Sequence, residues 1–242
     1  MKRLAELTTF ELEARLGAGP LVALVPVGST EPHGPHLSLD TDVVIGEEAA
    51  LRAVDALAEI GVAALVAPSI PYGVTEFAEG FKGAVSVPPA ALTAYVRAVV
   101  EALLAGGFSH VCLVNNHLEP AHDEAIRAAV AGLDRASVAC PLSRRWGRTL
   151  TAEFKSGACH AGRYETSLML AARPGGVRVD VQAGLAARDE SLSAGIRAGK
   201  RTFRELGMTR AYTGAPADAT ADEGHHTYAQ LVQMIVGEVT GR

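Results

Sequence analysis

Three short segments of the sequence combine histidine with acidic side chains, which together can bind a metal ion or carry protons. The first segment, residues 28–36, directly follows an apolar run over residues 21–27 that is typical of a buried strand. Glu31 and His33 lie two residues apart in it, and Asp42 follows nine residues later. If the strand stays extended to residue 33, Glu31 and His33 point the same way, because strand side chains alternate with period two.

The second segment repeats this pairing in reverse order. His117 and Glu119 follow another apolar run, residues 110–115. Ligands of open parallel sheets bind beyond the carboxyl ends of the strands, so both pairs are expected at one rim. Mixed nitrogen and oxygen ligands suit Zn²⁺ or Mn²⁺, and two such ions in hydrolases lie about 3.5–4 Å apart. Neither pair alone would indicate a site, but together with an aspartate they predict two divalent ions. The predicted ligands are Glu31, His33, Asp42, His117 and Glu119.

The third segment supplies a candidate proton carrier, His160, and a further acid, Glu165. Histidine is the side chain best suited to carry protons at neutral pH. Glu165 is expected either to orient His160 or to complete a metal shell. Cys159 is a conceivable nucleophile, but no Cys-His-Asn arrangement supports that role, and a buried structural thiol is the competing interpretation.

The remaining histidines carry weaker signals. His36 fits equally well a residue that supports the site and a hydrogen-bonded loop residue. Four others are interpreted as surface or helix histidines: His110, His122, His225 and His226.

The pattern of apolar residues predicts an α/β protein, with short strands alternating with longer helices. Strands are expected over 21–27, 62–66, 110–115 and 137–140. Thr8 and Glu11 form a capping-box pattern at the start of a short first helix, and Ser86 is a possible cap for a helix that begins at Pro88-Pro89. Further helices are expected over 42–60, 120–133, 164–172, 192–206 and 222–238. Such alternation is typical of a parallel sheet covered on both faces.

The composition limits the classes of function. With 242 residues and no linker, one domain is expected, and 48 % apolar residues are enough for a large core. The formal charge of −5 argues against a nucleic-acid partner. No signal peptide and no membrane span is recognised, and three cysteines without a CxxC motif favour a cytoplasmic protein without disulfides.

At these clusters the sequence resembles the creatininase (creatinine amidohydrolase) family. The similarity covers residues 26–42, 69–87, 113–126, 160–174 and 214–224. It implies a single creatininase-like domain over residues 1–242, with a three-layer α/β/α fold and a mainly parallel central sheet. It also implies a homo-oligomer, in the family a hexamer, and a small-molecule amide substrate. By position, the five residues named above match the family's metal ligands, Asp42 matches the ligand shared by both ions, and His160 matches the catalytic histidine.

The expected reaction is hydrolysis of a non-peptide C–N bond, possibly in a cyclic amide. Metal-activated water would attack, and His160 would give a proton to the nitrogen, which must leave as a neutral amine. Alternatives are a formamide deformylase, a peptidase that trims a peptide-derived cofactor precursor, and a catalytically silent metal-binding assembly protein.

Departures from the creatininase pattern make creatinine a doubtful substrate. Creatininase has a tryptophan and an aspartate shortly before the catalytic histidine, where this chain has residues 156–158 (Ser-Gly-Ala). Three other residues are therefore candidates for substrate binding: Trp146, Arg163 and Tyr164. Arg163 is the preferred candidate to pair with an anionic group of the substrate, since its planar fork binds carboxylates. The competing interpretation places it, with Arg144, Arg145 and Arg148, on a solvated basic surface.

Overall fold

A four-stranded, fully parallel sheet forms the centre of the computed structural model, which describes residues 1–241. The strands are β1 (Leu21–Val27), β2 (Ala63–Val66), β3 (His110–Asn115) and β4 (Ala136–Ala139), in the spatial order β2-β1-β3-β4. The two central strands, β1 and β3, therefore end side by side. These are the strands that precede the first two histidine–carboxylate segments.

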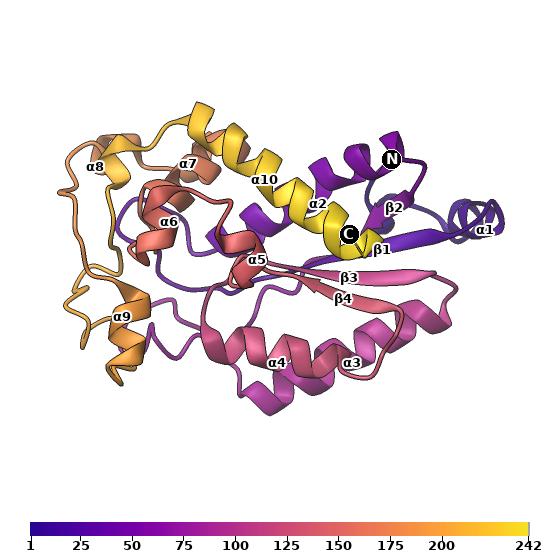
Figure 1. Cartoon of the computed structure of the whole chain (residues 1–242), viewed down its shortest axis with the longest axis horizontal. Coiled ribbons are helices and arrows are strands. Elements are labelled where there is room, and N and C mark those ends of the chain that lie inside the picture. The colour runs from indigo at the N-terminus through magenta and orange to yellow at the C-terminus, as the bar shows by residue number, and fades with distance from the viewer. Residues whose placement is uncertain (242) are drawn as a thin grey trace.

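Helices cover both faces of the sheet, which confirms the three-layer α/β/α prediction. Figure 1 shows α3 (Pro89–Ala105) and α4 (Pro120–Val130) below the sheet, and α2 (Thr41–Glu59) and α10 (Ala221–Thr240) above it. The short helix α7 (Arg163–Ala172) packs against α10 and α2.

The pattern of β1 explains why two layers of helices are needed. Its seven residues are all buried. Leu21, Ala23 and Val25 pack with α3 and α4, whereas Val22 and Leu24 pack with α2, α7 and α10. Because strand side chains alternate, a strand that is apolar throughout must be covered on both faces.

The remaining elements are short. They are α1 (Thr9–Gly17), α5 (Arg144–Gly147), α6 (Ala152–Ser156), α8 (Val179–Gln182) and α9 (Leu192–Arg197), with 3₁₀ turns at Leu4–Glu6, Pro174–Gly176 and Pro216–Asp218. The capping box of Thr8 and Glu11 is present at the start of α1. None of the helices in the described part of the chain has the length and apolar character needed to cross a membrane.

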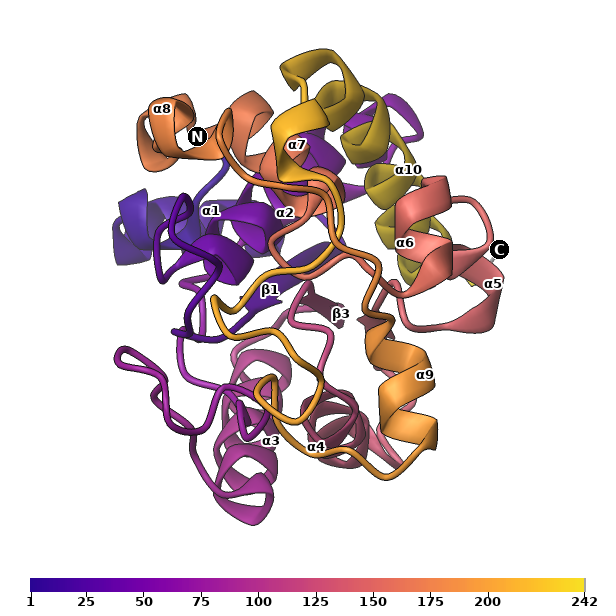
Figure 2. The ribbon, with the colours of Figure 1, turned by 90° about the vertical axis from the view of Figure 1, so that its left-hand side faces the viewer.

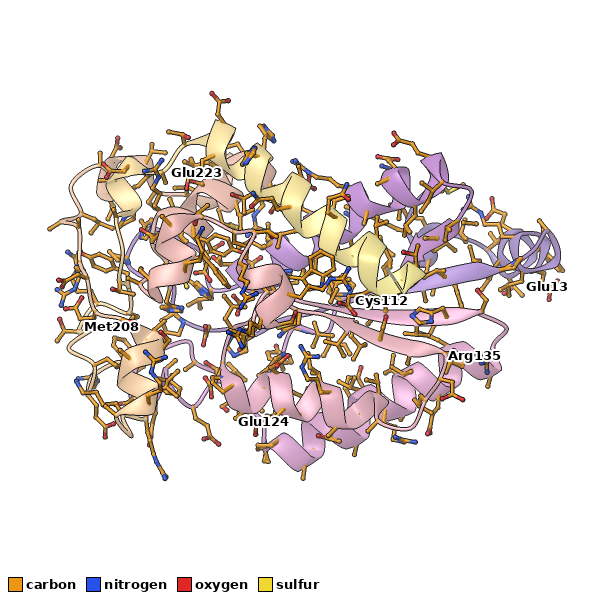
Figure 3. All side chains as sticks on the ribbon, viewed as in Figure 1. Glu13, Cys112, Glu124, Arg135, Met208 and Glu223 are labelled. Atoms are coloured by element: carbon orange, nitrogen blue, oxygen red, sulfur yellow. The ribbon has the colours of Figure 1, made fainter. Side chains whose placement is uncertain are left out.

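Two details of the sequence prediction were wrong. The helix expected over 192–206 ends at Arg197, because Gly199 has a φ of +82° and breaks the helical path. The following irregular segment crosses the end of the molecule, where Figure 3 labels Met208. Ser86 does not cap α3, since Pro88 occupies the N-cap position and the Ser86 hydroxyl accepts the Thr75 N–H instead.

Gly28 allows β1 to meet the start of α2. A Cβ atom at Gly28 would lie 2.9 Å from the Val43 nitrogen and 3.0 Å from the Asp42 Cβ. Both distances are shorter than packed atoms tolerate, so a larger residue would push the two elements apart.

Gly28→Ala is therefore expected to lower the free energy of unfolding by about 1–3 kcal/mol, the usual cost of overpacking, as measured by denaturant unfolding. Gly17→Ala is the matched control, because a Cβ there meets nothing within 4 Å and the residue lies in α1. The control is expected to be neutral or slightly stabilising. Equal stability of the two variants would show that the approach of β1 to α2 is not tightly packed.

Candidate metal centre

The candidate residues meet at a small cavity beyond the carboxyl ends of β1 and β3, the end of the molecule that faces the viewer in Figure 2. The cavity has a volume of about 50 Å³. Both polar and apolar side chains line it. Its lining consists of Glu31, Asp42, Phe77, His117, Leu118, Glu119, Pro120, Cys159, His160, Glu165, Leu192, Ile196 and Phe203.

Three acidic residues reach the cavity from the first turn or the N-cap of a helix. Asp42 lies in the first turn of α2, Glu165 in the first turn of α7, and Glu119 at the N-cap of α4. Glu31 and His33 lie in the loop after β1, not on an extension of the strand, which ends at Val27. Their side chains nevertheless reach the same site, with His33 Nε2 3.8 Å from Glu31 Oε1.

The potential ligand atoms converge on two neighbouring points. His117 Nδ1 lies 3.4 Å from Glu31 Oε1 and 2.9 Å from Asp42 Oδ2. His33 Nε2 lies 3.1 Å from Asp42 Oδ1 and 3.5 Å from Glu165 Oε2. Ligands about 2.1 Å from a tetrahedral ion are separated by about 3.4 Å, so these distances fit two shared centres. The two oxygens of Asp42 face one group each.

Three sets of side chains are close enough to hold a metal ion. They are Glu31, Asp42 and His117; His33, Asp42 and Glu165; and Glu31, His33 and His160. Glu165 is thus in a ligand group, whereas the predicted ligand Glu119 is in none of those found among the described residues. The position of Glu165 agrees with the second of the two roles considered for it.

All three histidines have one ring nitrogen fixed by a backbone carbonyl. His33 Nδ1 donates to Glu31 O at 3.2 Å, His117 Nε2 to Val74 O at 2.7 Å, and His160 Nε2 to Pro32 O at 3.0 Å. A carbonyl can only accept, so the N–H must be on those nitrogens. The other nitrogen of each ring faces the carboxylates, and when it is deprotonated it can bind a metal ion, which is the usual arrangement of metal-binding histidine.

The carboxylates are positioned by further donors. The Thr75 hydroxyl donates to Glu31 Oε2. The Ala161 N–H donates to Glu165 Oε2 at 2.7 Å, and Ala161 has a φ of +47°, rarely adopted by residues other than glycine. The backbone between His160 and Glu165 is therefore held in a strained conformation that brings both side chains to the site.

Glu119 is held differently. Its carboxylate accepts the backbone N–H groups of Glu76 at 2.9 Å and Phe77 at 3.3 Å. Burial raises its pKa to about 7, against the opposing effects of His117 and these hydrogen bonds. It lines the cavity as a separate carboxyl group beside the ligand groups.

The buried charges fit a site made for cations. Burial by itself would lower the pKa of His33, but Asp42, Glu165 and Glu31 outweigh it and raise that pKa to about 10. For the carboxyl group of Glu165 burial acts in the opposite direction and raises the pKa to about 8. Within residues 1–241, His33 Nε2 and Asp42 Oδ2 are buried without a hydrogen bond of acceptable geometry, although each has an oppositely charged atom nearby. Ligand atoms aimed at a common ion behave in this way, so the residues present fit divalent metal ions.

The three substrate-binding candidates lie away from the small cavity. Arg163 is exposed and pairs with Glu223 at the start of α10, which Figure 3 labels. Tyr164 is buried against Phe154. Trp146 donates its indole N–H to Glu238. The side-chain contacts of these residues hold α5, α6, α7 and α10 together, so their role in substrate binding is not supported by their positions.

Two further histidines support the site. His36 is buried and bonds through Nε2 to the Thr166 hydroxyl at 2.8 Å, next to Glu165. His122 lies on α4, as expected of a helix residue, but it is fully buried rather than on the surface. Its Nδ1 accepts the N–H of Val74, whose carbonyl fixes His117.

The other predictions about histidine and cysteine have simpler outcomes. His225 and His226 are exposed on α10, whereas His110 is half-buried on β3. Burial raises the pKa of the Cys159 thiol well above its usual value, with Glu165 and Glu153 adding to the effect. A thiolate nucleophile is therefore disfavoured.

The sequence did not reveal two contributors to the site. Phe203, from the irregular segment after α9, places its ring 4.4 Å from that of His160. Val74 links His117 to His122 only through its backbone, so its side chain carries no signal. Thr75, by contrast, lies in the stretch 69–87 that resembles the family. Its hydroxyl group was a signal in the sequence for a residue that could bond to a carboxylate of the site.

A buried carboxylate–histidine cluster beyond the ends of parallel strands defines an α/β protein with a candidate metal-binding site. The comparison with protein families is more specific. The model of the creatininase family, described as creatinine amidohydrolase, matches residues 5–239. The chain therefore belongs to the creatininase family of metal-dependent hydrolases.

Individual relatives differ in how much of their length is matched. The mycofactocin precursor peptide peptidase of Mycolicibacterium smegmatis is 36 % identical over 225 residues, which are 88 % of this chain and 81 % of the relative. The creatinine amidohydrolase of Pseudomonas putida is 34 % identical over 119 residues, 47 % of this chain and 44 % of the relative. A solved structure described as creatininase Mn has a TM-score of 0.74 and 24 % identity, and covers 99 % of this chain and 98 % of its own. That structure shows the shared fold.

Metal analysis of purified protein is expected to separate the roles of Glu165 and Glu119. The wild type should hold close to two divalent ions per chain. Glu165→Gln should lose at least one, because an amide replaces the carboxyl group whose oxygen lies 3.5 Å from His33 Nε2, and an amide binds divalent ions more weakly than a carboxylate. Glu119→Gln should retain both, and inductively coupled plasma mass spectrometry measures the difference. Loss of metal from Glu119→Gln, with both ions retained in Glu165→Gln, would show that Glu119 is a ligand and Glu165 is not.

Proposed function

We propose that this chain is a binuclear-metal hydrolase that cleaves an amide bond in a short, peptide-derived substrate. The observation that carries the proposal is the convergence of three carboxylates and three histidines, with unsatisfied ligand atoms, on a cavity. The preference for a peptide-derived amide over a cyclic amide is supported by the peptidase relative, which matches over most of its length, whereas the creatinine amidohydrolase matches over less than half.

The residues divide into two sets of ligands that share one carboxylate. Glu31, Asp42 and His117 would hold one ion, and His33, Asp42 and Glu165 the other. Asp42 presents a different oxygen to each set, so its carboxylate could serve both. The ligand types suit Zn²⁺ or Mn²⁺, and the structural relative is described as creatininase Mn. When bound, such ions lower the pKa of a coordinated water and polarise a carbonyl oxygen.

Hydrolysis adds the oxygen of water to the carbonyl carbon and breaks the C–N bond. One proton of the water must reach the nitrogen, because an amide anion is too basic to leave. His160 is placed to carry it, since Pro32 fixes Nε2 and leaves Nδ1 at the site, 3.9 Å from Glu31 Oε1. Glu119 is a carboxyl group that also lines the cavity without belonging to either of these two ligand sets. It is placed to hold the other proton, or to orient the water through its carboxylate.

Two rings pack against that of His160. The ring centroids of His33 and Phe203 lie 4.6 and 4.4 Å from its own. Such packing excludes water from the ring and fixes its direction, so that a proton moves between Nδ1 and the substrate rather than to bulk solvent.

A panel of amides tests the function. Short peptides, formamides and cyclic amides are incubated with metal-loaded protein, with and without EDTA. Hydrolysis of peptides that stops with EDTA and returns with Zn²⁺ or Mn²⁺ is the expected result. Preference for cyclic amides or formamides would favour those alternatives. Full activity in metal-free protein would reject a metal-dependent reaction, and no hydrolysis of any compound despite bound metal would favour the catalytically silent protein.

His160→Ala tests the proton carrier. The variant should keep its metal content and lose about 10²- to 10⁴-fold in kcat, the usual contribution of acid–base catalysis. Substrates with better leaving groups should lose less, because they depend less on protonation of the nitrogen. Loss of metal from this variant would instead assign His160 to the ligands, consistent with its closeness to Glu31 and His33.

A further inference from the structure

A second, larger cavity adjoins the candidate metal centre. It has a volume of about 490 Å³, against about 50 Å³ for the small cavity, and lies within the range that holds ligands larger than a single amide group. Residues from three segments of the chain line both cavities, so the two cavities share walls and belong to one site. The shared residues are Leu118, Pro120, Cys159, Leu192 and Ile196.

The charged side chains of the larger cavity are all basic. Arg144, Arg148 and Lys155 come from the segment of α5 and α6, and Arg197 from the end of α9. Figure 2 shows α5, α6 and α9 on the same side of the molecule. No aspartate or glutamate is among the described residues that line this cavity.

These four cations are also unpaired. Within residues 1–241, none of them has an ion pair or side-chain hydrogen bond, in contrast to Arg163, Arg173 and Arg188, which each pair with a carboxylate. In a chain of net charge −5, four neighbouring cations without a partner form a local positive field beside a cluster of buried carboxylates.

Between the cations the walls are apolar. Leu142, Phe154, Leu192 and Ile196 line the same space. Gly157 also lines it. A ligand that matches these walls has apolar groups and carboxylates in one extended molecule.

We infer that the larger cavity is a subsite for a carboxylate-bearing, peptide-like part of the substrate, held by Arg148, Arg197 and their two basic neighbours. That the bound molecule is a substrate rests on the proposed hydrolytic function. That it carries a carboxylate rests on the charge and shape of the cavity. Arginine is suited to it because its guanidinium binds carboxylates through two parallel hydrogen bonds.

Equilibrium binding tests the inference without requiring hydrolysis. The probe is a fluorescently labelled peptide, Glu-Leu-Glu-Leu-Glu, with an amidated C-terminus, compared with the corresponding Gln-Leu-Gln-Leu-Gln amide. Full-length protein should bind the acidic peptide about 10-fold more tightly at low salt, with the difference reduced at higher ionic strength. Equal affinity for the two peptides would overturn the inference. Because binding is measured separately from turnover, absent hydrolysis would count against the proposed function and not against this subsite.

Matched variants locate the binding. The double variant Arg148→Gln/Arg197→Gln should lose most of the preference for the acidic peptide. Lys82→Gln/Lys200→Gln removes the same charge from exposed residues that line neither cavity, and should retain it. An equal loss in both variants would show that the preference arises from overall charge, and would overturn the subsite.

A third peptide identifies which carboxylate is recognised. The Gln-Leu-Gln-Leu-Gln peptide with a free C-terminus carries only its terminal carboxylate. Binding as tight as that of the acidic peptide, and sensitive to the Arg148/Arg197 substitutions, would assign the subsite to a chain terminus. Weak binding would assign it to acidic side chains. Both results support a carboxylate subsite.

Discussion

Burial of several carboxylates around one point is the constraint on which the rest of this site depends. Glu31, Asp42 and Glu165 are each less than 4 % exposed, and removing the partner of a buried charge costs roughly 3–5 kcal/mol. Three histidines face them, but each has already committed one N–H to a backbone carbonyl. The other nitrogen of His33 and that of His117 lie close to carboxylate oxygens, so each must be either protonated or turned toward a cation. A divalent ion satisfies nitrogen lone pairs and carboxylates together, and because it binds only the folded arrangement it also stabilises the fold.

The fold meets this constraint by placing acids at helix N-termini. Asp42 and Glu165 lie in the first turns of α2 and α7, and Glu119 precedes α4. The positive end of the helix dipole stabilises negative charge there, by typically about 0.3–1 kcal/mol in exposed positions. Parallel strands are what bring these helix starts to one end of the sheet, since each connection returns the chain to the same edge. The strained backbone at Ala161 helps to position His160 and Glu165, and the close approach at Gly28 helps to position Asp42.

Most of this arrangement was accessible from the sequence, and the failures have physical reasons. Continuous apolar runs identified the strands, and the pairs Glu31/His33 and His117/Glu119 located the end of the sheet where the site forms. The extended geometry assumed for Glu31 and His33 was wrong, although both reach the site, because the loop after Val27 is shaped by tertiary contacts such as Glu31 N–H to Leu39 O. Spacing along the chain does not contain the three-dimensional distances that place Glu165 beside His33 and Asp42, and the role of Glu119 as a metal ligand stays a prediction. Helical periodicity after residue 197 was misleading because one glycine redirected the chain.

That redirected chain explains how one end of the sheet holds two cavities of different character. The segment after α9 carries Phe203 across the small cavity, where it packs on His160 and is itself held by Phe77 and Phe81. A continuous helix over 192–206 would carry Phe203 along a different path. The small cavity is about one tenth of the volume of the larger one, about 50 Å³ against about 490 Å³, so a long substrate would extend from the first into the second. Leu192 and Ile196 on α9 form the wall between the two spaces, and the larger space beyond them is lined by the four cations that have no partner within residues 1–241. A neutral, compact ring would leave that volume and those charges without a partner, whereas an extended anionic chain would contact both.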